Sequence, residues 1–127
     1  TTTTTSPAAP AAVDGPVLRG SGSFVGLAGH RGSGQVGVFE LPDGSSVLRL
    51  EGIDIQNGPD LHLYVVPGAG ATDPVEGSLY LGALRGNVGD LTYDLPSDRP
   101  LDPGPWTVLV WCDAFSVEFV AADVALS

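Results

Sequence analysis

Glycine and proline interrupt this chain so often that an ordinary helix has no room in most of it. Between Val17 and Gly104, no stretch free of both residues is longer than seven residues. A typical helix needs roughly 10–12 residues, and an interior glycine or proline costs about 1 or 3 kcal/mol relative to alanine. Short strands fit between such breaks, so the sequence predicts an all-β fold.

Apolar segments of strand length recur along the chain with turn residues between them, which is typical of a small antiparallel β-sandwich. The predicted strands are Gln35–Leu41, Val47–Leu50, Leu61–Val66, Ser78–Leu81, Leu91–Leu95, Trp106–Cys112 and Phe115–Val120. Pro42-Asp43-Gly44-Ser45 predicts a hairpin turn, because proline is preset for the second turn position and glycine takes a positive φ without cost.

Two of these strands carry a further expectation. Trp106–Cys112 is apolar on both faces, so we expect a central strand that is covered on both sides. Phe115-Ser116-Val117-Glu118-Phe119 alternates strictly, so its three apolar residues should be buried on one face.

The first residues differ in composition from the rest of the chain. Thr1–Ala12 contains only Thr, Ser, Pro and Ala, and such a segment cannot offset the entropy of becoming ordered. We therefore predict a disordered, lipoprotein-like linker over residues 1–16 and a single β-sandwich domain over residues 17–127. Because the chain begins at Thr1 and has no methionine, we expect that a signal peptide or lipid anchor has been removed.

The charge of the chain excludes some partners. Fifteen acidic residues face five arginines and no lysine, for a net charge of −10. Binding to a phosphate backbone needs a basic patch, so nucleic acid is excluded as a main partner. Anionic membranes are disfavoured for the same reason, and we expect contact with a membrane only through the removed anchor. The simplest interpretation of the acidic residues is that they form a solvated surface.

The cysteine count and the missing motifs exclude some chemistry. One cysteine rules out an internal disulfide and any site with several thiolates. A Gly-x-Ser-x-Gly elbow is absent, and a Walker loop needs a lysine that the chain lacks. A hydrolytic enzyme is therefore the last-ranked hypothesis, and whether the protein is an enzyme at all stays open.

Cys112, His30 and His62 are the residues best suited to chemistry. Cys112 ends the most apolar predicted strand, where it either packs as a small hydrophobic residue or opens onto a site beside Asp113. His30 lies in a glycine-rich loop, and His62 alternates with Leu61 and Leu63 and so points to the opposite face. A surface imidazole is the simpler interpretation of His62.

Two sets of residues are candidates for binding a metal ion. His30, His62 and Cys112 are the minimum set for a His2Cys copper site, but no histidine follows the cysteine and no methionine is present for an axial position. Asp54, Asn57 and Asp60 are close enough in sequence to contact calcium, without the spacing of an EF-hand loop.

Six blocks of the sequence follow one another in a set order: Gly22-Ser23-Phe24, His30-Arg31-Gly32-Ser33-Gly34, Asn57-Gly58-Pro59-Asp60-Leu61-His62-Leu63-Tyr64, Leu81-Gly82-Ala83-Leu84-Arg85-Gly86-Asn87-Val88-Gly89, Tyr93-Asp94-Leu95-Pro96 and Val108–Phe119. In this order they resemble a known family, the DM-thirteen or electron-transfer DM domain. The Gly-Pro-Asp-Leu and Val-Trp-Cys-x-x-Phe segments are the specific ones.

The resemblance implies an extracytoplasmic β-domain, found alone in bacterial envelope proteins and beside haem-binding DOMON domains in animals. It implies a redox role for the cysteine of the Trp-Cys motif, here Cys112, as a bare thiol or as a ligand. The family's histidine ahead of its Ser-Gly pair corresponds to His30, and Arg85 replaces its usual lysine. The ending departs from the family pattern, because Phe119-Val120-Ala121-Ala122 stands where Phe-Gly-x-Ala is usual.

Two function hypotheses follow. The first is a secreted or envelope-bound redox or ligand-binding module, with Cys112 as the reactive or ligating atom and Cys112, His30 and Trp111 as candidate contacts to a cofactor. The cofactor is a haem, a metal ion or none, and the partner is a redox protein or an envelope ligand. The alternative is a non-catalytic module that binds a protein or a glycan and keeps Cys112 in its core.

Overall fold

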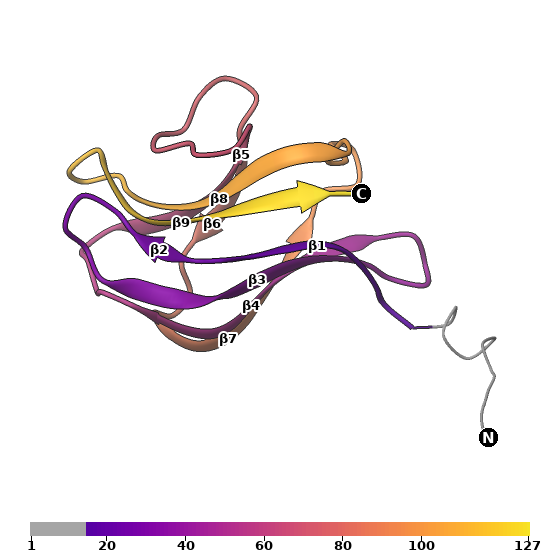
Figure 1. The fold of residues 1–127 in the computed structure, drawn as a ribbon, viewed down its shortest axis with the longest axis horizontal. Coiled ribbons are helices and arrows are strands. Elements are labelled where there is room, and N and C mark those ends of the chain that lie inside the picture. Colours follow the sequence, from indigo (N-terminus) through magenta and orange to yellow (C-terminus); the bar gives the residue numbers. More distant parts are fainter. Residues whose placement is uncertain (1–14) are drawn as a thin grey trace.

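A computed structural model describes residues 15–127, and within them the chain forms strands joined by turns and loops, without a helix (Figure 1). The strands are β1 (Val17–Ser23), β2 (Val25–Gly26), β3 (Gly32–Glu40), β4 (Ser46–Ile55), β5 (Leu61–Pro67), β6 (Leu79–Ala83), β7 (Val88–Leu95), β8 (Gly104–Cys112) and β9 (Val117–Leu126).

The strands make two antiparallel sheets that face each other, as Figure 1 shows. One sheet has four strands in the order β1-β3-β4-β7, and the other has five in the order β2-β9-β8-β5-β6. The predicted all-β class and the small antiparallel sandwich are therefore confirmed.

The core lies between the two sheets, where every second side chain of a strand points inward. The largest fully buried side chains of this core come from both layers: Leu48, Leu50, Ile53, Ile55, Leu63, Val38, Val65, Val108, Val110 and Val120. Most of these are the leucines and β-branched residues of the predicted strands, which is why their pattern could be read from the sequence.

One side of the sandwich closes where β1 approaches β9. A Cβ on Gly22 would lie 2.1 Å from the backbone oxygen of Asp123, so no side chain fits there. The backbone nitrogen of Ser127 also donates a 2.9 Å hydrogen bond to the carbonyl oxygen of Arg19. The chain then passes from one sheet to the other at Phe24, and β2 pairs with β9.

Six of the seven predicted strands lie largely within observed strands, and the seventh, Phe115–Val120, overlaps β9 only from Val117. The structure adds β1 and β2, whose glycines break up the apolar pattern, and β4 continues to Ile55 past Gly52. A register shift between Leu50 and Ile53 accommodates that glycine, which has a φ of 58°. These differences have one cause. The prediction ends a strand at each glycine, whereas in the structure the glycines of β1, β2 and β4 lie within strands.

The hairpin between β3 and β4 is confirmed. The backbone nitrogen of Gly44 donates to the carbonyl oxygen of Leu41 at 2.9 Å, which puts Pro42 at the second turn position. Gly44 has the expected positive φ, at 90°. Asp43 accepts hydrogen bonds from the backbone nitrogen and the hydroxyl of Ser45, and these lower the pKa of its carboxyl group.

The expectation for the segment that begins at Phe115 is wrong. Phe115 is 68% exposed and lies in the turn before β9, whereas Phe119 is 4% exposed and belongs to the core. Ser116 has a φ of 50°, so the extended alternation that the prediction assumed is broken at that residue. The strand begins at Val117 and runs to Leu126.

β8 is the central strand of its sheet, as predicted. Its inner face meets the other sheet, and part of its outer face is covered by the loop between β5 and β6, which stands over the sheet in Figure 1. Thr107 holds that loop: its hydroxyl donates to the carbonyl oxygen of Gly68 at 2.7 Å and accepts from the backbone nitrogen of Ala71 at 3.2 Å. The end of β8 near Cys112 lies beyond this cover.

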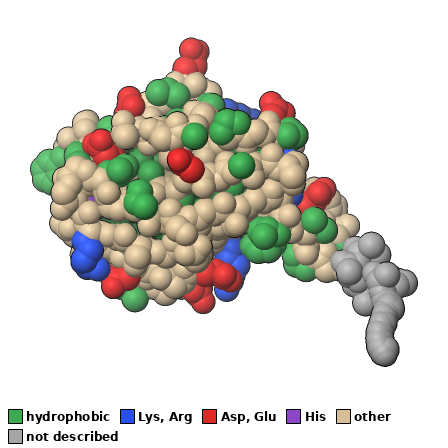
Figure 2. All heavy atoms as spheres, in the orientation of Figure 1, with side chains coloured by type: hydrophobic (Ala, Val, Ile, Leu, Met, Phe, Trp, Pro, Cys, Tyr) green, Lys and Arg blue, Asp and Glu red, His purple; other side chains and the backbone are tan. Residues whose placement is uncertain are grey.

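Acidic side chains are scattered over the face seen in Figure 2, with apolar side chains between them. Arg31 lies 3.0 Å from Asp54, and Arg49 lies 2.7 Å from Glu51, so some of the acids are paired. Residues 15–127 contain no helix with the length and apolarity that a membrane crossing requires. The predicted linker over residues 1–16 falls almost wholly outside the described residues and stays a prediction.

Candidate functional site

Cys112 is the last residue of β8, and its side chain is fully buried. It pairs with Leu61 across the ladder to β5 and belongs to the apolar cluster between the sheets. Such surroundings keep the sulfur from solvent. The geometry therefore matches the packing alternative for this residue.

His30 precedes β3 and packs against the edge of the core. Its ring stacks on Phe119 with a centroid distance of 3.7 Å and an interplanar angle of 14°. Its Nδ1 atom lies 2.9 Å from the carbonyl oxygen of Leu27. One face and one nitrogen of this imidazole are thus engaged in local structure.

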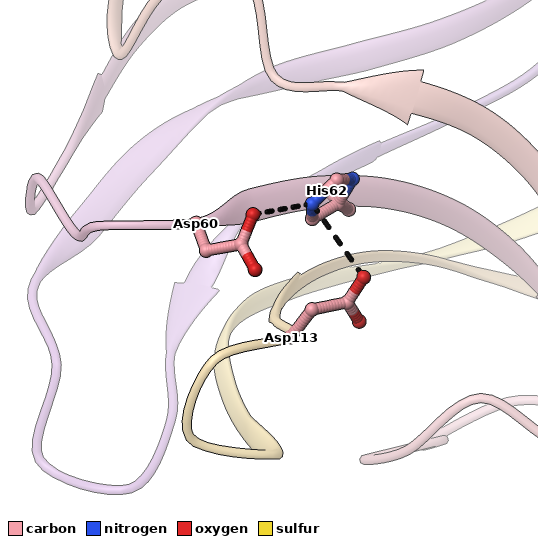
Figure 3. Close-up of side chains that lie close together, drawn as sticks. All are labelled: Asp60, His62 and Asp113. Atoms are coloured by element: carbon pink, nitrogen blue, oxygen red, sulfur yellow. Dashed lines mark hydrogen bonds and ion pairs between the residues drawn. The ribbon is translucent and has the colours of Figure 1, made fainter.

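His62 lies on the outer face of the five-stranded sheet and contacts two carboxylates (Figure 3). Its Nε2 atom is 2.7 Å from Oδ1 of Asp60 and 3.5 Å from Oδ2 of Asp113. Its Nδ1 atom is 2.7 Å from the phenolic oxygen of Tyr80. We call Asp60, His62 and Asp113 the imidazole–carboxylate cluster.

The pairing of β5 with β8 holds this cluster together. Asp60 directly precedes β5, and Asp113 directly follows β8, so antiparallel pairing brings both to the same end of the sheet. The backbone nitrogen of Asp113 donates to the carbonyl oxygen of Asp60 at 3.0 Å and extends the ladder by one bond. Both carboxylates are therefore held by backbone geometry, although their side chains are 44% and 41% exposed.

Aromatic side chains surround the imidazole. Trp111 pairs with His62 across the strands and is half-buried on the same face. Tyr80, on the edge strand β6, is 51% exposed, and its ring lies 5.1 Å from that of Tyr64. We call Tyr64, Tyr80 and Trp111 the outer aromatic set.

The carboxylates act on Tyr64 as well. Partial burial raises the pKa of Tyr64, and the negative charge of Asp113 raises it further, with smaller contributions from Tyr80 and Asp60. All of these effects disfavour the phenolate. Tyr64 is therefore held as a neutral phenol to a higher pH than an ordinary tyrosine.

The cluster has two chemical capabilities. A ring nitrogen within 2.7 Å of a phenol, with a carboxylate on the other nitrogen, is suited to receive and hold a proton. One imidazole nitrogen and two carboxylate oxygens also form a donor set that suits divalent first-row ions. Within residues 15–127 it is the one group of three or more His, Cys, Asp or Glu side chains with ligand atoms close enough to share an ion.

The structure thus brings one of the predicted metal-site residues into such a group and not the other two. His62 belongs to it, whereas His30 and Cys112 lie elsewhere. The weak calcium set is separated too: Asp54 pairs with Arg31 at 3.0 Å, and Asn57 accepts from the backbone nitrogen of Gly58. Of that set, Asp60 alone is part of the cluster.

Sequence reasoning overlooked Asp113 and Tyr80 as partners of His62. A signal was present, since Asp60 and Asp113 each adjoin an end of a strongly apolar strand. Using it required knowing that β5 pairs with β8 in this register. Tyr80 came close through a further pairing, β5 with β6, in which the register shifts between Leu63 and Tyr64.

Comparison with protein families decides the relationship that the motifs indicated. The family model described as Electron transfer DM13 matches residues 23–124, which is most of the chain. The chain belongs to the DM13 family. It is therefore related to electron-transfer modules, and the imidazole–carboxylate cluster lies within the matched region. Comparison with curated proteins and with solved structures finds no match.

Proposed function

We propose that this DM13 domain is an electron-transfer module of the cell envelope that exchanges electrons on the outer face of its five-stranded sheet. The observation that carries the proposal is the gathering of oxidisable rings around His62, at the end of the strand that contains the Trp-Cys motif. Indole and phenol rings are the side chains through which a surface can pass single electrons, and the neighbouring imidazole accepts protons.

The burial of Cys112 defines its place in this proposal. With an exposed fraction of 0%, its sulfur has no access to a partner's disulfide, so exchange through a mixed disulfide is disfavoured. Trp111 is its neighbour in the chain and is half-buried on the outer face. We therefore assign contact with the electron partner to the outer aromatic set, which includes Trp111. Cys112 is then a buried residue of the core beneath this set.

A metal ion is the cofactor that the cluster suits best. Asp60, His62 and Asp113 would hold a divalent first-row ion, and a redox-active ion bound there would add a one-electron centre beside Trp111. Tyr80 on Nδ1 would orient the imidazole, as outer hydrogen bonds do at metal sites. Neither haem nor a metal ion is required for the aromatic set itself to exchange electrons.

The first test is spectroscopic and electrochemical. The purified domain is examined for visible absorption and by voltammetry, before and after incubation with cupric or ferrous ion. We expect electron exchange that is weakened in Trp111→Phe and His62→Gln and retained in the matched control His30→Gln. Absence of any exchange in the wild-type domain, with and without metal, would refute the proposal.

The envelope location is proposed on two supports, the relationship to DM13 modules and the Thr/Pro/Ala composition of the first residues. Fractionation of cells that express the complete gene product tests it. Recovery in the envelope or the medium is expected, and recovery in the cytosol would contradict it.

The same surface also supports the alternative of a binding module. Tyr80 and Phe115 expose large aromatic area next to the cluster, and tyrosine, tryptophan and phenylalanine are enriched at protein interfaces. A panel of envelope glycans and candidate proteins distinguishes the two functions. Binding that is lost in Tyr80→Ala and Phe115→Ala, in a domain without electron exchange, would favour the binding module.

A further inference from the structure

For a neutral His62, the contacts of its two ring nitrogens define the direction in which protons are shared. A neutral imidazole carries its proton on one nitrogen and accepts with the other. Asp60 is an acceptor when it is ionised, so the Nε2–H of His62 donates to it across 2.7 Å. Nδ1 is then free of a proton, and the hydroxyl of Tyr80 donates to it across 2.7 Å. The order is phenol, imidazole, carboxylate.

From this order we propose that Tyr80 is a redox-active tyrosine that transfers its phenolic proton to His62 when it is oxidised, an inference that rests on the proposed electron-transfer function. In the oxidation, Tyr80 loses one electron to an outer-sphere one-electron oxidant, such as a metal complex or the redox centre of a partner protein. The O–H bond of Tyr80 breaks, an N–H bond forms at Nδ1 of His62, and the products are a neutral phenoxyl radical, an imidazolium and the reduced oxidant. Reduction by one electron returns the proton to Tyr80.

Imidazole is the better acceptor for this proton. An imidazole binds a proton more strongly than a carboxylate does. The imidazolium would lie 2.7 Å from an oxygen of Asp60 and 3.5 Å from an oxygen of Asp113. These two carboxylates stabilise the positive charge that the proton creates.

The other two tyrosines have no such acceptor. The hydroxyl of Tyr93 donates to the carbonyl oxygen of Ala83 at 3.0 Å, and that ring is 5% exposed. A backbone carbonyl cannot hold the proton. Tyr64 has the carboxylate of Asp113 as its neighbour, and a carboxylate binds a proton more weakly than an imidazole does. Among the three tyrosines, Tyr80 alone therefore combines an imidazole partner with access to solvent.

The position of Tyr80 also suits exchange with a partner. It lies on β6, at the edge of its sheet, with 51% of its surface exposed. The Tyr64 ring is 5.1 Å away, and the His62 ring is 5.6 Å away. An electron entering or leaving at Tyr80 is thus next to the rest of the outer aromatic set.

The experiment oxidises the intact domain with photogenerated tris(bipyridyl)ruthenium(III), a cation that the net charge of −10 attracts. Formation of the phenoxyl radical is followed by transient absorption and by electron paramagnetic resonance. We expect Tyr80→Phe to lose most of the phenoxyl signal and the matched variant Tyr93→Phe, at a tyrosine outside the outer aromatic set, to keep it.

The role of His62 is tested with Tyr80 in place. In His62→Gln, oxidation of Tyr80 should slow on the order of 10²-fold, because its general base is gone. In His62→Ala, added imidazole should restore part of the rate, which a merely structural role of His62 would not predict. His30→Gln is the control, and a melting curve of each variant confirms that it is folded.

Two results would overturn the proposal: an undiminished phenoxyl signal in Tyr80→Phe, or wild-type oxidation rates in His62→Gln. Neither depends on the proposed function, because the added oxidant replaces the native partner. A domain that shows no electron exchange in voltammetry but forms the radical that depends on His62 would keep the Tyr80 assignment and lose the proposed electron-transfer function. A domain that exchanges electrons but forms no radical on Tyr80 would keep the proposed electron-transfer function and lose the Tyr80 assignment.

Discussion

The two faces of the five-stranded sheet differ most where β5 begins and β8 ends. On the inner face, Cys112 and Leu63 have exposed fractions of 0%, and both belong to the apolar cluster between the sheets. On the outer face, His62 keeps 17% of its side chain exposed, with two carboxylates near its Nε2 atom. Adjacent residues of one strand, Trp111 and Cys112, thus belong to a wet surface and a dry core.

This difference means that the intrinsic reactivity of a side-chain type does not decide which residues of this domain are placed for chemistry. Cysteine is the most reactive side chain of the Trp-Cys motif in solution, but its reactivity needs a thiolate and access. The dry face gives the thiol no access to a partner, whereas the wet face provides a proton acceptor, two carboxylates and oxidisable rings. In this domain we therefore expect changes on the inner face to alter stability and changes on the outer face to alter chemistry.

Leu63→Ala should show the largest effect, because it removes a fully buried side chain from the inner face. Leucine-to-alanine changes in cores cost about 2–5 kcal/mol. The measurement is denaturant unfolding, with His62→Ala, the next residue on the opposite face, as the matched control. If the outer-face change destabilises the domain as much as the inner-face change, the division between the two faces is wrong.

Thr107→Val tests the part of the outer face that the loop covers. Thr107 is the buried polar residue among the described residues, and its hydroxyl holds the loop through Gly68 and Ala71. Removing the hydroxyl leaves a buried carbonyl and a backbone N–H without this partner, which costs about 1–3 kcal/mol.

The unfolding of Thr107→Val is compared with that of Thr72→Val, whose side chain is exposed on the same loop. Hydrogen exchange of the amides of residues 68–71 should speed up in Thr107→Val alone. Unchanged stability and exchange would mean that the loop is held by its apolar contacts and that the hydroxyl is dispensable.

Cys112→Ala should cost on the order of 1–2 kcal/mol, since it leaves a small cavity in the core. In the wild-type domain, a small disulfide reagent should label Cys112 only after denaturation, because the sulfur is fully buried. Ser97→Cys in the Cys112→Ala background supplies an exposed thiol as the positive control. Rapid labelling of native Cys112 would restore the bare-thiol hypothesis.

Much of the fold could be predicted from the sequence because it depends on local patterns. Leu61 and Leu63 alternate with His62 and Tyr64, which was enough to place the imidazole on the outer face. Pro42 and Gly44 specify their turn chemically. Phe115 was misplaced because a turn at Ser116 looks the same in sequence as one more step of a strand.

The site could be predicted only in part, because it depends on strand pairing. Asp113 follows His62 by some fifty residues in the chain, and nothing local to either residue specifies that β8 lies beside β5. The pairing follows from how the whole set of strands buries its apolar faces, which is a property of the sandwich rather than of a motif. Tyr80 needed a second such pairing and was missed for the same reason.

The smallest effect we predict concerns Tyr64, which is partly buried on the outer face. Burial, and then the charge of Asp113, raise its pKa above the ordinary value of 10.0. The folded protein therefore holds this proton at pH values where the unfolded chain has released it. Stability from this group is complete below pH 10.0 and is lost as the pH rises from there through the folded-state pKa.

Spectrophotometric titration of tyrosinate should thus show a late component that disappears in Tyr64→Phe. The decline of melting temperature between about pH 9 and pH 11 should also be shallower in Tyr64→Phe than in the wild-type domain. Asp113→Asn is the more specific test, because it removes the negative charge and keeps the phenol of Tyr64. In this variant the late component should titrate at a lower pH, closer to that of an ordinary tyrosine. If Asp113→Asn leaves it in place, burial alone accounts for the raised pKa, and the carboxylates of the cluster do not act on the outer aromatic set.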